Sequence, residues 1–243
     1  FPFINLQMLI GKHLGLKWIV GKMLEKQDPR TVKMYNEIKD IIEHGDEYFD
    51  ITAIYKYFPV RRKYGKEKNE FSLEILSDDL TEVIETFNFP RQKYGQYLSL
   101  NDYVAPSGID YIGFFVATAG EKSRIVSNEL KAKGEFYKGH LVNSIGLELA
   151  EATSEYIHQI MRKDVGIIDK ELQTEDILKA NYQGNRYSFG YPACPDLSDQ
   201  RKLFNLLKPE RYGISLTEEF MMYPEATVSA IVFSQPFCKY FNM

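Results

Sequence analysis

The sequence predicts an α+β fold in which helices flank a twisted antiparallel sheet. Segments with strand character and segments with helical periodicity do not alternate regularly along the 243 residues. Regular alternation is typical of a doubly wound parallel sheet, so its absence favours antiparallel pairing. Residues 109–118 form a nearly continuous apolar run, which indicates a central strand buried on both faces.

The first 48 residues are expected to be helical. Residues 4–26 carry an apolar stripe at helical spacing, and residues 31–42 carry a second one after the helix-start signal Asp28-Pro29. His44-Gly45 ends the second helix. We therefore expect a single domain with an N-terminal helical part over residues 1–48 and a sheet-containing, ligand-binding part over residues 49–243.

Three further segments have strand character. Residues 50–58 are rich in Ile, Tyr and Phe, residues 69–76 alternate apolar with polar side chains, and residues 227–233 are apolar and β-branched. The charged connection between the first two contains Gly65, as a hairpin does. Its basic residues are interpreted as a solvated hairpin tip; they are Arg61, Arg62, Lys63, Lys66 and Lys68.

A long amphipathic helix is predicted over residues 136–162, where apolar residues recur every three or four positions. Shorter helices are expected over 175–180 and 199–207. Glu148, Glu151 and Glu155 form an acidic stripe on the long helix. A solvated face is the default interpretation, and a carboxylate that attracts a cationic ligand group is the alternative. His158 is expected on the polar face.

Composition excludes several classes of function. The net charge of −4 argues against a general nucleic-acid binder, and no apolar run reaches the ~18 residues of a membrane span. Two cysteines do not make a disulfide framework, which favours a cytoplasmic location. The four histidines lack the spacing of a metal site, and no dinucleotide fingerprint or P-loop is present. Cys194 has no evident base, so we predict neither catalytic residues nor a metal.

Residues 181–196 differ from the rest of the chain. Two glycines and two prolines indicate an irregular backbone whose amides are not used by helix or sheet. Arg186 offers a planar guanidinium suited to a carboxylate, and Tyr191 offers an aromatic face and a hydroxyl. The residues alone support two interpretations: a clamp for a small ligand, or a rigid structural loop with a surface arginine.

The same segment resembles a known family. Arg-x-x-x-Gly-Tyr-Pro, followed by Ala193-Cys194-Pro195, is similar to the signature of the activation domain of cobalamin-dependent methionine synthase. Further stretches resemble that family in the same order; they are 102–106, 110–113, 148–152, 216–218, 222–224, 228–229 and 234–240. An ordered series is more specific than one short motif. The resemblance covers about residues 90–241, and residues 1–89 match loosely.

The resemblance implies a non-Rossmann fold that binds S-adenosylmethionine on an antiparallel sheet. Such a domain docks on a cobalamin-binding domain or subunit. There, flavodoxin or another reductant supplies an electron, and S-adenosylmethionine supplies the methyl group for reductive methylation of cob(II)alamin. The chain would then be a component of a methyltransferase that is not active alone. The implied ligand contacts are Arg186 with the methionine carboxylate, Tyr191 and the backbone at Tyr187 and Ala193 around the ligand, Tyr240 from the C-terminal strand, and Glu151 near the methionine or sulfonium end.

Some positions depart from the family pattern. An aspartate expected just before the segment that starts at Phe1 is missing, Ala180 stands where an acidic residue is usual, and Phe241 replaces a frequent tyrosine. Two other functions stay open: a docking or regulatory protein for a corrinoid protein that has lost ligand binding, and a methyltransferase acting on another corrinoid protein. The loosely matching N-terminal half favours a free-standing activation subunit.

Overall fold

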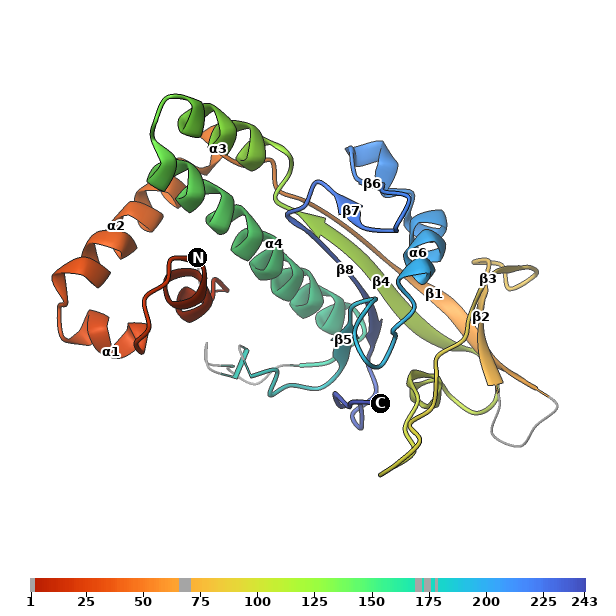
Figure 1. The fold of residues 1–243 in the computed structure, drawn as a ribbon. Coiled ribbons are helices and arrows are strands. Elements are labelled where there is room, and N and C mark those ends of the chain that lie inside the picture. Colours follow the sequence, from red (N-terminus) through yellow and green to blue (C-terminus); the bar gives the residue numbers. More distant parts are fainter. Residues whose placement is uncertain (1–2, 66–70, 169–171, 173–175, 178) are drawn as a thin grey trace. The chain divides into compact units, whose positions relative to one another are not determined.

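The computed structural model describes residues 3–65, 71–168, 172, 176–177 and 179–243 (Figure 1). The chain forms two compact units. Unit 1 comprises Phe1–Ala53, Ala117–Tyr156 and Tyr223–Val228, and unit 2 comprises Ile54–Val116, Ile157–Met222 and Ser229–Met243. The organisation as a single domain stays a prediction.

Unit 1 is mainly helical. Its elements are the π-helical turn η1 (Gln7–His13), α1 (Val20–Glu25), α2 (Pro29–Glu43), the short η2 (Gly45–Glu47), α3 (Lys122–Ala132) and the first part of α4 (Phe136–Asp164). Asp28 caps α2, because its carboxylate accepts a hydrogen bond from the Thr31 amide at 2.9 Å. Ile38, Leu141 and Ile145 are buried in the core of this unit.

The prediction of one helix over residues 4–26 is wrong. Helical structure stops after His13 and resumes at Val20. Gly15 lies between them with φ of 76°, a left-handed conformation that no α-helix contains. The Gln7 side chain accepts a hydrogen bond from the Val20 amide at 2.8 Å and donates to the Trp18 carbonyl at 3.2 Å. The apolar stripe therefore runs over two helical segments that are joined by a folded connection.

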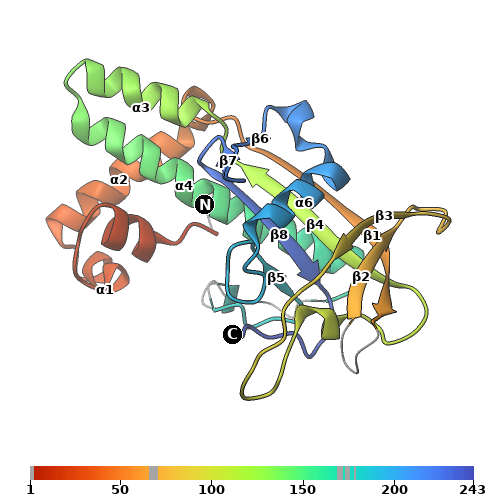
Figure 2. The ribbon, with the colours of Figure 1, turned by 45° about the vertical axis from the view of Figure 1, so that its right-hand side comes forward.

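The predicted antiparallel sheet is confirmed. Its six strands have the order β3-β2-β1-β4-β8-β5, and most of their residues belong to unit 2. The β1–β2, β2–β3 and β5–β8 pairs are antiparallel, and Figure 2 shows β4 and β8 running in opposite directions. The strands are β1 (Thr52–Tyr64), β2 (Phe71–Leu76), β3 (Val83–Phe87), β4 (Asp110–Thr118), β5 (Asn185–Tyr187) and β8 (Thr227–Phe233).

Short elements complete unit 2. They are η3 (Leu100–Tyr103), η4 (Leu197–Asp199), α6 (Gln200–Leu207), η5 (Pro209–Tyr212) and β6 (Ser215–Leu216); β6 pairs in a separate two-stranded sheet with β7 (Met222–Tyr223). The core contains a group of stacked rings. Phe87 lies 5.4 Å from Phe114, 5.8 Å from Phe89 and 6.1 Å from Phe189 between ring centroids. Phe189 thus fixes the segment after β5 to the core.

Most of the other predicted elements are confirmed. The segments 31–42, 109–118, 136–162, 199–207 and 227–233 correspond to α2, β4, α4, α6 and β8. The strand predicted over 50–58 continues to Tyr64. The strand over 69–76 is described from Phe71 onward, and its first two residues, like part of the helix predicted over 175–180, lie outside the described residues.

The interpretation of the basic residues as a hairpin tip needs a correction. Lys66 and Lys68 lie outside the described residues, whereas the other three belong to β1. Arg61 and Lys63 form ion pairs with Glu74 on β2, at 2.8 and 2.9 Å. The Arg62 guanidinium lies 4.6 Å from the centre of the Phe71 ring. Cross-strand pairing explains these charges, because side chains two apart on a strand point to the same face.

Candidate functional site

The candidate site is built on β5, the edge strand of the sheet. Arg186 pairs with Val232 and Tyr187 pairs with Ile231 on β8. The expectation that this segment's amides are not used by a sheet is therefore wrong for residues 185–187. The irregular backbone begins after Tyr187. Strand pairing thus fixes Arg186, while the loop that follows stays outside the sheet.

The loop closes in a tight turn at Tyr191. The Gly190 amide donates to the Cys194 carbonyl, and the Cys194 amide donates to the Tyr191 carbonyl, both at 2.9 Å. Tyr191 is 67% exposed at the tip of this turn, whereas Ala193 is buried beneath it. The turn therefore presents an aromatic side chain to solvent on a backbone held by its own hydrogen bonds.

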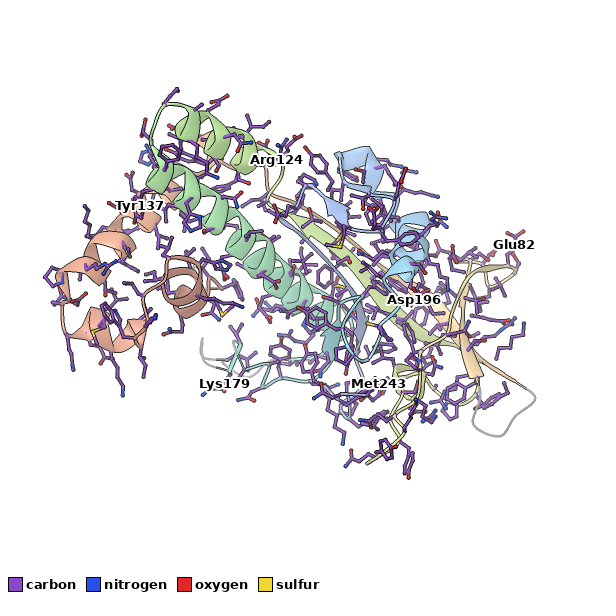
Figure 3. The ribbon with its side chains drawn as sticks, in the orientation of Figure 1. Glu82, Arg124, Tyr137, Lys179, Asp196 and Met243 are labelled. Atoms are coloured by element: carbon purple, nitrogen blue, oxygen red, sulfur yellow. The ribbon has the colours of Figure 1, made fainter. Side chains whose placement is uncertain are left out.

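Two further contacts stabilise the loop. The Cys194 thiol donates to the Ser188 carbonyl at 2.9 Å, and burial raises the pKa of this thiol to about 12. A thiol with that pKa is protonated at neutral pH, so Cys194 is not an activated nucleophile. Asp196, labelled in Figure 3, accepts a hydrogen bond from the Ser198 amide at 2.9 Å and caps η4. Hydrogen bonds therefore hold the loop on both sides of Tyr191.

Aromatic residues from the C-terminal segment lie beside β5. Tyr187 is buried, and its hydroxyl donates to the Lys239 carbonyl at 2.8 Å. Burial raises the pKa of Tyr187 well above its usual value. The Tyr240 ring lies 5.4 Å from the Tyr187 ring and is 56% exposed. The structure thus brings Tyr240 to the segment that contains Arg186, Tyr191 and Ala193.

Glu151 is exposed on α4 and belongs to unit 1, whereas the other five predicted site residues belong to unit 2. The solvated acidic stripe is wrong for its neighbours, because Glu148 and Glu155 are both buried. The Glu148 carboxylate lies 3.1 Å from His13 Nε2, and burial raises the pKa of Glu148. Of the three carboxylates, Glu151 alone has the exposure that a ligand contact requires.

The expectation for His158 is also wrong, since its side chain is fully buried. It belongs to a group that we call the His158 cluster, formed by His158 and Arg162 on α4 together with Tyr182 and Arg186. The ring of Tyr182 contacts both α4 residues, and the Tyr182 hydroxyl lies 3.2 Å from Arg186 Nη1. Sequence reasoning missed this cluster. Its one detectable signal is the spacing of His158 and Arg162 by one helical turn.

Among the described residues, no three His, Cys, Asp or Glu side chains gather closely enough to hold a metal ion. No helix in the described part of the chain is both long and apolar enough to cross a membrane. The candidate site comprises a guanidinium, exposed aromatic rings and a hydrogen-bonded backbone. These groups are suited to binding an organic anion with a planar part.

Comparisons with known proteins give a consistent result. The model of the family described as "Vitamin B12 dependent methionine synthase, activation domain" matches residues 14–243. The methionine synthases of Mycobacterium tuberculosis and Mycobacterium leprae are 34% and 32% identical over 206 residues. That alignment covers 79% of this chain but 17% of each relative. The crystal structure of the MetH reactivation domain bound to AdoHcy matches with a TM-score of 0.87 and 27% identity, over 99% of this chain and 77% of that one.

Proposed function

Because the chain belongs to the family of vitamin B12-dependent methionine synthase activation domains, we propose that it binds S-adenosylmethionine. The bound ligand would present its methyl group for reactivation of a cobalamin that a partner domain or subunit carries. The observation that carries the proposal is the segment from Arg186 to Asp196. It presents a guanidinium and an exposed aromatic ring on a rigid backbone, in a fold similar to that of a reactivation domain bound to AdoHcy.

Arg186 would bind the methionine carboxylate of the ligand. Its guanidinium offers parallel N–H donors that match the two oxygens of a carboxylate. The side chain is half-buried, and partial exclusion of water strengthens a charge-assisted hydrogen bond. A hydrogen bond to a charged group contributes about 1.5–3 kcal/mol. Because solvent screens a half-exposed guanidinium, we take about 2–4 kcal/mol for the two bonds together.

Aromatic groups would bind the planar part of the ligand. Tyr191 and Tyr240 are both exposed, and their faces can stack on a purine. The hydroxyl of Tyr187 already donates to the Lys239 carbonyl, so Tyr187 would contribute its backbone rather than its side chain. Ala193 is small and buried, and its backbone would contact the ligand.

Glu151 has the exposed negative charge that attracts an ammonium or sulfonium group. Because it belongs to unit 1 and Arg186 to unit 2, its contact with the ligand stays a prediction from the family resemblance. S-adenosylmethionine supplies an electrophilic methyl group, and the corrinoid partner supplies the group that accepts it. The residues of this chain therefore have only to bind and orient the ligand, which is why no catalytic dyad is expected. Flavodoxin or another reductant is the proposed electron donor, and the proposed location is the cytoplasm.

Isothermal titration calorimetry of S-adenosylmethionine with the native protein and with Arg186→Ala tests the proposal. The expected loss of affinity is roughly 30- to 1000-fold, the equivalent of about 2–4 kcal/mol. Arg201→Ala is the matched control, because Arg201 is an exposed arginine on α6 that lies 5.0 Å from the Phe220 ring. We expect its affinity to remain within about twofold of native.

Two results would contradict the proposal in different ways. Undetectable binding by the folded native protein would leave a docking or regulatory protein for a corrinoid partner as the function. Equal binding by the native protein and Arg186→Ala would remove Arg186 from the site while leaving ligand binding intact.

A further inference from the structure

We propose that Tyr182 is a positioning residue: held by Arg162 and His158, it orients the Arg186 guanidinium toward the carboxylate of the ligand. This inference rests on the proposed function of Arg186. All four residues of the His158 cluster belong to unit 2. Tyr182 lies four residues before Arg186 in the chain, and its hydroxyl oxygen is 3.2 Å from Arg186 Nη1.

The ring of Tyr182 is fixed by two contacts from α4. The Arg162 guanidinium carbon lies 3.8 Å from the ring centroid, a close cation–π contact. The His158 ring meets it edge to face, with centroids 5.4 Å apart and an interplanar angle of 72°. Arg162 and His158 are both buried. Rotation of the Tyr182 ring would break contacts that water cannot replace, so the hydroxyl has a defined position.

His158 fixes the orientation of Arg162. Arg162 Nη1 lies 3.2 Å from His158 Nδ1. A guanidinium has only donors, so Nδ1 accepts and the imidazole proton is on Nε2. Burial, and then the positive charges of Arg186 and Arg162, hold the pKa of His158 well below its usual value. A neutral imidazole can therefore accept this hydrogen bond throughout the physiological pH range.

The hydrogen bond between Tyr182 and Arg186 orients the Arg186 guanidinium. Because the guanidinium can only donate, the Tyr182 hydroxyl oxygen accepts from Arg186 Nη1. An arginine side chain has many rotamers, and restricting them before the ligand arrives reduces the entropy lost on binding. Strand pairing of Arg186 with Val232 fixes the backbone, and Tyr182 fixes the far end of the side chain.

The experiment compares two ligands that differ in one group, S-adenosylmethionine and its decarboxylated form. Tyr182→Phe keeps the ring and its contacts with Arg162 and His158 but removes the hydroxyl. We expect Tyr182→Phe to bind S-adenosylmethionine about three- to tenfold more weakly than the native protein does. The two proteins should have the same affinity for the decarboxylated form. Titration calorimetry or competition against a fluorescent adenosine analogue measures both affinities.

Tyr57→Phe is the matched control. The Tyr57 hydroxyl donates to the Met161 carbonyl of α4 at 3.0 Å, so this variant also loses one tyrosine hydrogen bond, but one that involves no residue of the His158 cluster. It should bind both ligands as the native protein does. Arg162→Lys is the second test variant, because an ammonium keeps the charge but cannot lie flat on the ring. Like Tyr182→Phe, it should bind S-adenosylmethionine more weakly than the native protein does and bind the decarboxylated form equally well.

The double variant Arg186→Ala with Tyr182→Phe completes the test. If Tyr182 acts through Arg186, the double variant loses no more affinity than Arg186→Ala alone. The inference is overturned if Tyr182→Phe and Arg162→Lys bind S-adenosylmethionine as the native protein does, or if both ligands weaken equally. In either case, native binding and its loss in Arg186→Ala would still support the proposed function.

Discussion

Gly184 immediately precedes β5, and its replacement by alanine tests how the site is built. Its φ is 82°, a conformation that L-residues rarely adopt. A β-carbon at this position would lie 3.0 Å from the Phe233 carbonyl oxygen and 3.4 Å from the Ser234 Cα, both on the backbone of the neighbouring chain segment. Asn185, the next residue, pairs with Phe233. A side chain here would therefore push β5 away from β8.

Two separate contributions determine how much Gly184→Ala lowers the free energy of unfolding. The left-handed backbone conformation costs an alanine about 1–2 kcal/mol. The close contact adds about 1–3 kcal/mol, as overpacking does, because backbone atoms in a sheet move little. Gly184→Ala should therefore lower the free energy of unfolding by about 2–5 kcal/mol. Gly213→Ala is the control: its φ is 76°, but no atom lies within 4 Å of its β-carbon position. Only the first cost applies to Gly213.

Urea unfolding followed by circular dichroism gives both free energies by linear extrapolation. Gly184→Ala should be less stable than Gly213→Ala by about 1–3 kcal/mol. It should also lose affinity for S-adenosylmethionine, because Arg186 lies two residues further along the displaced strand, whereas Gly213→Ala should keep it. Equal destabilisation by the two substitutions, or native ligand affinity in Gly184→Ala, would refute the argument that close pairing of β5 with β8 positions Arg186.

Two further predictions concern buried titratable groups. The pKa of His158 in the folded protein is well below its unfolded value of 6.5. Below about pH 6.5, the unfolded chain therefore takes up a proton that the native state does not. The free energy of unfolding should then fall by up to ~1.4 kcal/mol per pH unit as the pH drops. His158→Gln should flatten this slope between about pH 6.5 and pH 5.5 in urea titrations, and identical slopes would contradict the burial of a neutral imidazole. Burial and a pKa of about 12 should protect Cys194 from iodoacetamide in the native protein at about pH 8, whereas the protein unfolded in urea should react. Peptide mass spectrometry locates the alkylated cysteine, and rapid alkylation of Cys194 in the native protein would contradict this prediction.

The sequence predicts those elements in which the order of apolar and polar residues matches the burial of their side chains. The run that forms β4 and the spacing that forms α4 are examples. Helix α3 was not predicted because its fully buried residues are Ser123 and Ser127. Only Val126 and Leu130 add apolar side chains to its packed face, so its apolar periodicity is weak. Strand β3 was not predicted because Val83 and Ile84 are both exposed, and the alternation that marks a half-buried strand is missing.

The same reasoning explains what was found of the site. The loop at Arg186 is detectable because its glycines, prolines and arginine are adjacent in the sequence. In the His158 cluster, only the spacing of His158 and Arg162 is visible in the sequence. Tyr182 meets Arg162 only after the end of α4 packs against the segment that leads into β5. His158 was assigned to a polar face because helical spacing was assumed to continue. At this end of α4, however, Ile157, Met161 and Arg162 are buried as well, and the exposed face carries Tyr156 and Lys163 instead of His158.

The structure of the protein with S-adenosylhomocysteine bound tests the central claim most directly. We predict that the ligand carboxylate accepts hydrogen bonds from the Arg186 guanidinium, with N–O distances of roughly 2.7–2.9 Å. The adenosine moiety should contact Tyr191, Tyr240 and the backbone at Ala193. The Arg186 guanidinium should keep its contact with the Tyr182 hydroxyl. A ligand bound on another surface, or bound here with its carboxylate turned away from Arg186, would contradict the account.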